Sequence, residues 1–263
     1  MAQPALFISH GSPIMAVQQS PTSDFLKALG KSLNTPRAIV IFSAHFDMAN
    51  DEAAHNIVIT AGQAPETIHD FYNFPAHMYN IKYPAPGHPE LAGNIATLFK
   101  NKGITAILDE RQGWDHGVWI PLRLMYPQAN IPIVQVSINT QLGAKAMYEY
   151  GQLLAPLRDD NILIIGSGGI SHNLREVFKT PATPNRVQMV KAFTQWVEHT
   201  LLAQDTPALL NYLADAPHVL FNHPTQEHFL PLFAAMGAGG KQVEKLFSDI
   251  ELDILALDTY KFY

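Results

Sequence analysis

The feature that most constrains the fold of this chain is a set of short runs that are apolar at nearly every position. The four clearest runs are Ala5–Ser9, Ala38–Ser43, Ile133–Ser137 and Ile162–Gly166. Successive side chains of a β-strand point to opposite faces of the sheet, so these runs are apolar on both faces. Such strands belong at the centre of a sheet that is covered by helices on each side.

Helical patterns lie between these runs. Pro89–Lys102 begins with proline and ends before Gly103, and Asn185–Leu202 carries an apolar stripe at helical spacing. The other expected helices are Ala144–Leu157, Pro207–Leu213 and Glu227–Met236, and the weaker strands are His55–Thr60, Thr105–Leu108 and Leu252–Leu257. This alternation predicts an α/β sandwich whose central sheet is mostly parallel or mixed, with helices on both faces. We expect residues 1–263 to form a single domain.

Charge and cysteine content exclude several classes of function. The net charge is −6 and no Lys/Arg cluster occurs, so neither nucleic acid nor an anionic membrane is expected as a partner. The chain has no cysteine, which excludes disulfides, thiolate catalysis and Cys-ligated metals. It also begins without the features of a signal peptide, so we expect a cytoplasmic protein. A charged share of only 15% is compatible with a homo-oligomer.

The chain has 12 histidines, and three of them share one structural position. His10, His45 and His172 each follow a predicted buried strand closely. In open α/β sheets the carboxyl ends of the strands are where sites assemble, so we expect at least two of the three to meet. A single histidine after a strand is more often structural, but three at equivalent positions favour a shared site.

Two further histidines stand in distinctive surroundings. His116 lies between Asp115 and Gly117, before a short amphipathic helix, and His228 precedes the helix expected near the C-terminus. His69 and His77 flank a long aromatic stretch between residues 62 and 89, and loops of that length are usually functional. The remaining candidates, His55, His88, His199 and His218, have the surroundings of ordinary surface or loop residues.

Histidine side chains at one site suit zinc, iron, copper or nickel. Two histidines and a third ligand leave open positions, as in non-heme iron(II) sites or in a zinc site that activates water. A further histidine without a metal bond can transfer protons. The residues alone leave iron and zinc as alternatives.

Seven motifs, taken in order along nearly the whole chain, resemble one family. They are Ser9–Pro13, Ser43–His45, Thr67–Phe71, Tyr83–Gly87, Asp115–Gly117, Ser171–Leu174 and Pro224–Leu232. Together they are similar to those of the 4,5-DOPA extradiol dioxygenase family, which belongs to the class III (LigB-type) extradiol ring-cleaving dioxygenases. The resemblance implies a single catalytic domain that opens the ring of a catechol such as DOPA, with O2 as co-substrate and Fe(II) as working metal. Zn(II) is expected as a possible substitute ion.

The resemblance also assigns roles to the histidines. It implies His10, His45 and His228 as metal ligands, His172 as the acid–base residue or an additional ligand, and His116 as a second proton-transfer residue near the substrate. The wider class generally has a glutamate as third ligand, and Glu227 stands beside His228. Adjacent residues at a helix start point about 100° apart, so both are not expected to bind, and the DOPA branch favours His228.

Two other functions remain open on the sequence. The same histidines could hold a zinc ion that hydrolyses an amide or ester. A non-enzymatic binding protein of the same superfold is the second alternative, although four histidines together (His10, His45, His172 and His228) argue against it.

Overall fold

The computed structural model describes residues 2–49, 57–179 and 181–263. His55 and the start of the strand expected at His55–Thr60 lie outside these ranges. Ten strands occur in the described part: β1 (Ala5–Ser9), β2 (Ala38–Asp47), β3 (Ile57–Thr60), β4 (Ala106–Asp109), β5 (Ile133–Ile138), β6 (Ile162–Gly168), β7 (Val243–Phe247), β8 (Ile250–Glu251), β9 (Leu255–Ala256) and β10 (Thr259–Phe262). The α-helices are α1 (Pro21–Ser32), α2 (Pro89–Lys100), α3 (His116–Met125), α4 (Gly143–Leu154), α5 (Leu174–Val177), α6 (Pro184–Leu202), α7 (Thr206–Leu210), α8 (Tyr212–Asp215), α9 (Val219–Asn222) and α10 (Leu230–Gly239), and the 3₁₀ helices are η1 (Pro13–Ala16), η2 (Ala76–Asn80) and η3 (Ala155–Asp160).

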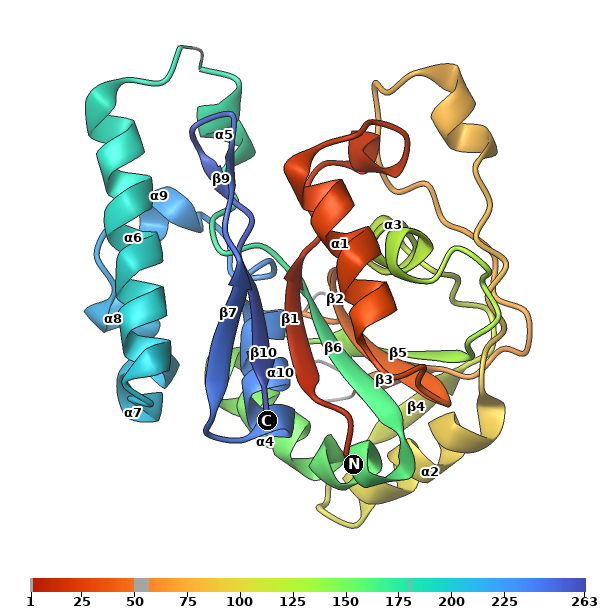
Figure 1. The fold of residues 1–263 in the computed structure, drawn as a ribbon. Helices are drawn as coiled ribbons and strands as arrows, with labels where there is room; N and C mark the ends of the chain where they lie inside the picture. The colour runs from red at the N-terminus through yellow and green to blue at the C-terminus, as the bar shows by residue number, and fades with distance from the viewer. Residues whose placement is uncertain (1, 50–56, 180) are drawn as a thin grey trace.

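Eight of these strands form one mixed sheet in the order β4-β3-β5-β2-β6-β1-β10-β7 (Figure 1). The four central strands β5, β2, β6 and β1 are parallel, whereas β3 pairs with β5, and β10 with β1, in the antiparallel direction. Every residue of β1, β5 and β6 is buried. The prediction of central strands that are apolar on both faces is therefore confirmed.

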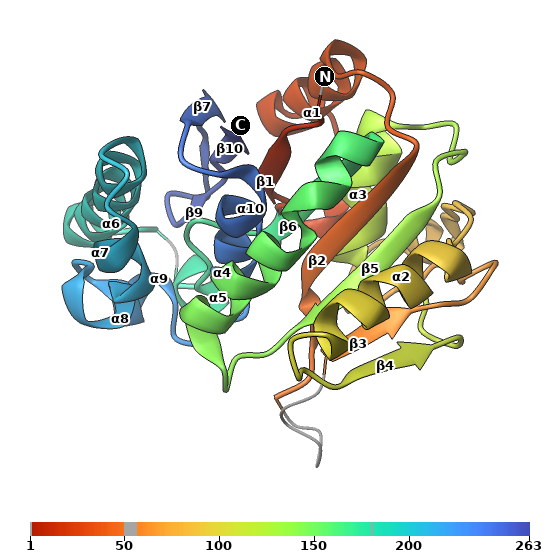
Figure 2. The ribbon, with the colours of Figure 1, turned by 90° about the horizontal axis from the view of Figure 1, so that it is seen from below.

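Helices cover both faces of the sheet, as Figure 2 shows. α2, α4 and α10 lie on one face, and side chains such as Phe7 and Val40 pack against them. α1 and α3 lie on the other face, where Leu6 and Ile39 belong to a separate apolar cluster. Alternate residues of one strand thus enter two cores, and the predicted α/β sandwich with a mixed sheet is confirmed.

Several element boundaries differ from the sequence predictions. The expected strand Leu252–Leu257 is shorter than predicted: positive φ angles at Leu252 and Asp253 turn the chain, and only Leu255–Ala256 form a strand, β9, which pairs with β8 as a short hairpin. The helix expected at Ala144–Leu157 ends at Leu154 and continues as η3, which contains Pro156, and the one expected at Pro207–Leu213 divides into α7 and α8.

Two boundary corrections concern the histidines directly. β2 does not end at Ser43 but continues through His45 to Asp47, with an irregular register between Phe42 and Asp47. α10 begins at Leu230 and not at Glu227, because Pro231 occupies the first turn, so Glu227 and His228 lie in the turn before the helix. The expected angle of about 100° between these two side chains therefore does not apply.

No helix within the described ranges is long and apolar enough to cross a membrane.

Candidate functional site

The order of the central strands brings distant histidines to one edge of the sheet. β6 lies between β2 and β1, so the carboxyl ends of the three strands are neighbours. His10 follows β1, His45 stands near the end of β2, and His172 comes four residues after β6. The Nε2 atoms of His10 and His45 are 3.1 Å apart.

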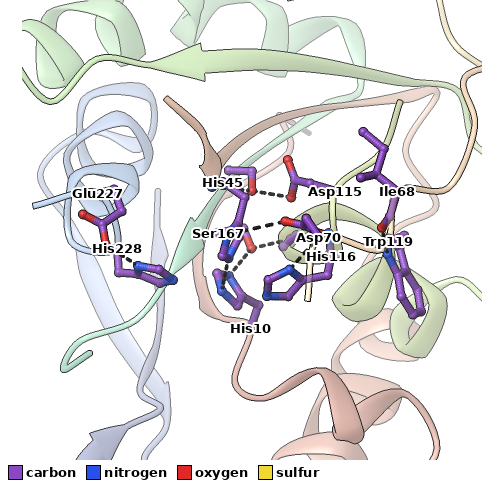
Figure 3. Close-up of polar contacts among 12 residues, drawn as sticks. His10, His45, Ile68, Asp70, Asp115, His116, Trp119, Ser167, Glu227 and His228 are labelled. Carbon is purple, nitrogen blue, oxygen red and sulfur yellow. Dashed lines mark hydrogen bonds and ion pairs between the residues drawn. The ribbon is translucent and has the colours of Figure 1, made fainter. Parts of the chain in front are cut away.

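Three more histidines complete the cluster. His228 faces the pair from the turn before α10, with its ring centroid 5.3 Å from that of His10 and 5.0 Å from that of His45 (Figure 3). His116, the first residue of α3, lies on the other side, 3.9 Å from His45 between ring centroids. The ring of His172 stacks on that of His228 at 3.4 Å, with an angle of 8° between the planes.

The hydrogen bonds of His10 determine which of its ring nitrogens carries the proton. Its Nδ1 lies 3.0 Å from Ser167 Oγ, and the Ser167 hydroxyl donates to the carbonyl oxygen of Gly117. Because that hydroxyl proton is already committed, Oγ must accept from His10 Nδ1–H. Nε2 of His10 therefore keeps its lone pair, which points into the cluster.

Carboxylates determine the tautomers of two other histidines in the same way. His45 Nδ1 lies 3.5 Å from Asp70 Oδ2, and His228 Nδ1 lies 3.1 Å from Glu227 Oε1. An ionised carboxylate only accepts, so both Nδ1 atoms carry protons and both Nε2 atoms carry lone pairs. The lone pairs of three imidazoles thus point toward one another across a short distance, an arrangement that a cation stabilises.

Burial keeps these imidazoles uncharged. It lowers the pKa of His10 and of His228 well below the usual value, and the neighbouring histidines lower both further. Burial, then the charge of His116, lowers the pKa of His45 to about 3, although Asp70 opposes the shift. Neutral imidazole is the form that binds a metal.

Within the described residues, three groups of side chains have ligand atoms within 4.8 Å of one another. These groups are His10–His45–His228, His45–Asp70–His116 and His172–Glu227–His228. Two nitrogens on one ion at about 2.1 Å lie about 3 to 3.5 Å apart, which matches the 3.1 Å between His10 and His45. Asp70 and Glu227 instead face Nδ1 atoms and act as hydrogen-bond acceptors, so the first group fits a metal best.

A buried polar chain lies behind His45 and was not expected from the sequence. Ser43 Oγ donates to Asp115 Oδ1 at 2.6 Å, and Gln135 Nε2 donates to Asp115 Oδ2. The backbone N–H of His45 donates to Ser43 Oγ at 3.2 Å. Burial, together with the charge of Asp70, raises the pKa of Asp115 to about 6. Gln135, a polar residue inside an apolar run, was the available signal.

Asp70 and Ser167 are the two other contacts that sequence reasoning missed. Asp70 lies on the aromatic loop, in a motif used only for the family resemblance, and Ser167 lies in a buried strand end. The loop histidines themselves stay apart from the cluster: His69 Nε2 donates to the carbonyl of Ile81 at 3.0 Å, and His77 is exposed.

Comparisons with known proteins show which family the chain is similar to. Residues 4–256 match the family described as the catalytic LigB subunit of aromatic ring-opening dioxygenase. The chain is 38% identical to 4,5-DOPA dioxygenase extradiol of Beta vulgaris, over 97% of this chain and 95% of that protein. It is 39% identical to the protein of the same name from Escherichia coli K12, over 89% of this chain and 84% of that protein.

A solved structure extends the match to the fold. The crystal structure of an uncharacterised protein from Escherichia coli K12 superposes with a TM-score of 0.82 at 33% identity, covering 99% of this chain and all of that one. The fold of this chain thus matches a solved structure over nearly its full length. The chain belongs to the LigB family and is an enzyme of the aromatic ring-opening dioxygenase class.

Proposed function

We propose that this enzyme opens the ring of a catechol such as DOPA by extradiol cleavage, with O2 as co-substrate and Fe(II) held by His10, His45 and His228. The observation that carries the proposal is the convergence of three Nε2 lone pairs, each set by the acceptor that faces Nδ1 of the same ring. Three neutral ligands leave the full +2 charge of the ion to attract an anionic catecholate. Bound Fe(II) supplies the open coordination positions and the redox chemistry that ring opening by O2 requires.

We propose that two histidines beside these ligands transfer protons. His172 stacks on His228, and burial, followed by the charge of His116, lowers its pKa to about 4. His172 is therefore neutral at pH 7 and can accept a proton from a catechol hydroxyl. His116 lies beside His45 on the opposite side of the cluster, where it can serve a second proton transfer.

The substrate class rests on the curated relatives. Those from Beta vulgaris and Escherichia coli carry the name 4,5-DOPA dioxygenase extradiol, and we propose that this chain acts on DOPA or a similar catechol. Zn(II) would fit the same ligands but lacks redox chemistry, so we propose it as a substitute ion only. We also propose that residues 1–263 form the catalytic unit and that the enzyme works in the cytoplasm.

The test is a reconstitution with a single metal at a time. Protein stripped by a chelator is loaded anaerobically with Fe(II) or with Zn(II), and is then mixed with DOPA and with a panel of simple catechols in air. We expect the Fe(II) form to consume one O2 per catechol and to release a yellow ring-opened product. The Zn(II) form is the matched control and should take up no oxygen. Ester or amide hydrolysis by the Zn(II) form, without oxygen uptake by either form, would reject the proposal.

A further inference from the structure

Asp70 is a carboxylate that contacts two histidines of the cluster from a loop. It lies between β3 and α2, on the loop formed by residues 61–88. Its Oδ1 accepts the backbone N–H of His116 at 2.9 Å and lies 3.0 Å from His116 Nδ1. Its Oδ2 lies 3.5 Å from His45 Nδ1. The two carboxylate oxygens of Asp70 thus contact the rings of two different histidines, as Figure 3 shows.

The loop reaches this position because its backbone runs beside the start of α3. Ile68 N–H donates to the carbonyl of Trp114, and Trp114 N–H donates to that of Glu66, both at 2.8 Å. The indole N–H of Trp119 donates to the carbonyl of Ile68 at 2.9 Å. These hydrogen bonds hold the loop to the start of α3 as far as Ile68. Two residues later, the Asp70 side chain makes the next contact by accepting the backbone N–H of His116.

Beyond Asp70 the same loop carries aromatic side chains toward the cluster. Phe71 is buried, and its ring centroid lies 5.9 Å from that of His116 and 5.3 Å from that of Tyr79. Asp70 is therefore the point at which this aromatic segment is joined to the histidine cluster.

The charge of Asp70 suits this position. Asp70 is half-buried, and its two carboxylate oxygens face the rings of His45 and His116. No Lys or Arg pairs with Asp70 in the part of the chain that the structure describes. Its partners are the two histidines.

We infer that Asp70 is a positioning residue that couples the loop of residues 61–88 to the metal ligands. Its Oδ2 holds the proton of His45 on Nδ1, which leaves Nε2 free for a metal, while its Oδ1 fixes His116 and the loop. Coupling of this kind is reciprocal, so metal binding at His45 also stabilises the loop. The inference rests on the proposed role of His45 as a ligand.

Replacing Asp70 with asparagine keeps the acceptor for His116 but removes the acceptor that faces His45 Nδ1. An Asn side chain still accepts the His116 N–H with its carbonyl oxygen, but then its NH2 group faces His45 Nδ1. Two donors facing each other are unfavourable, so the variant favours the tautomer of His45 with its proton on Nε2, which competes with metal binding. Asp70→Asn should keep the fold and weaken Zn(II) affinity about 10- to 100-fold, the usual effect of losing such a partner.

The measurements are Zn(II) titration and hydrogen exchange, neither of which requires catalysis. We expect Zn(II) to slow amide exchange at residues 68–81 in the unmodified protein and not in Asp70→Asn or Asp70→Ala. Asp253→Asn is the charge-matched control, because Asp253 is exposed on the β8–β9 turn at φ 59°, a conformation that Asn tolerates. It should bind Zn(II) normally.

Two results would overturn the inference. One is normal Zn(II) affinity in Asp70→Asn, and the other is equal Zn(II)-induced protection of the loop in all variants. Failure of the proposed dioxygenase function gives a different pattern: the unmodified protein would bind Zn(II) and protect its loop, yet take up no O2 in the Fe(II) form.

Discussion

At the scale of single residues, the second ring nitrogen of each histidine decides what the first can do. Ser167 and Glu227 accept from Nδ1 of His10 and His228, and the Asp70 carboxylate faces Nδ1 of His45 at 3.5 Å. Each contact leaves one Nε2 lone pair for the site. Carboxylate or hydroxyl partners of this kind orient metal-binding histidines and increase their basicity.

This arrangement yields a prediction for the adjacent pair Glu227 and His228. His228→Ala should abolish stoichiometric metal binding, because it removes one of three converging nitrogens. Glu227→Ala should still bind one ion, with affinity reduced about 10- to 100-fold, because only the partner of Nδ1 is lost. Metal analysis after dialysis, with calorimetric titration, distinguishes the two variants. The reverse order, with metal retained by His228→Ala and lost by Glu227→Ala, would make the glutamate the third ligand.

At the scale of elements, the site depends on a close approach between the end of β6 and the turn before α10. The carbonyl of His228 accepts the N–H of Gly169 at 2.9 Å. A Cβ added at Gly168 would lie 2.1 Å from the same carbonyl oxygen, so only glycine fits there. Gly168, the last residue of β6, therefore positions His228, which is 60 residues further along the chain (228 − 168).

Gly168→Ala should therefore displace His228 and destabilise the fold. Forced overpacking of this kind costs about 1–3 kcal/mol, and we expect weaker metal binding as well. The control is Gly169→Ala, because a Cβ there would meet atoms only at 3.6 and 3.9 Å, which is ordinary contact. Urea unfolding measures the stability of both variants, and Zn(II) titration measures their metal affinity. Equal behaviour of the two alanine variants would contradict it.

The elements also show where sequence patterns succeed and where they fail. The strands β1, β5 and β6 follow the predicted apolar runs closely, because burial on both faces leaves a strong signal. β7 and β10, at and next to the sheet edge, and the amphipathic helix α1 were not predicted. β7 is half exposed and mixes charged with apolar residues, so its run is weak, although its pairing with β10 places it firmly.

At the scale of the whole molecule, a group of uncharged histidines is buried within an α/β core. His223 belongs to this group, and only 2% of its surface is exposed. Its Nε2–H donates to the carbonyl of Ile170 at 2.8 Å. Among the described residues its Nδ1 has no hydrogen-bond partner. Burial lowers its pKa to about 3, against the opposing effect of the Ile170 bond.

This burial predicts how the stability of the metal-free protein changes with pH. Between pH 6.5 and about 3, unfolded His223 binds a proton that folded His223 does not, so the free energy of unfolding falls as pH falls. One such group contributes at most about 1.4 kcal/mol per pH unit. His223→Gln should therefore reduce the slope in urea unfolding between pH 6 and pH 4.5. An unchanged slope would mean that His223 is already charged in the folded state.

The chain by itself determined the layered architecture and the region of the site. Both follow from local properties: apolar runs mark strands that are covered twice, and a histidine just after such a strand must lie at the carboxyl edge of the sheet. The tertiary structure alone decided which atoms face each other there. Glu227 is adjacent to His228, but the other partners come from far along the chain: Ser167 is 157 positions from His10, and Asp70, which contacts the ring and the backbone N–H of His116, is 46 positions from it. A hydrogen bond within about 3 Å depends on how whole elements pack, and no periodicity along the chain records that distance.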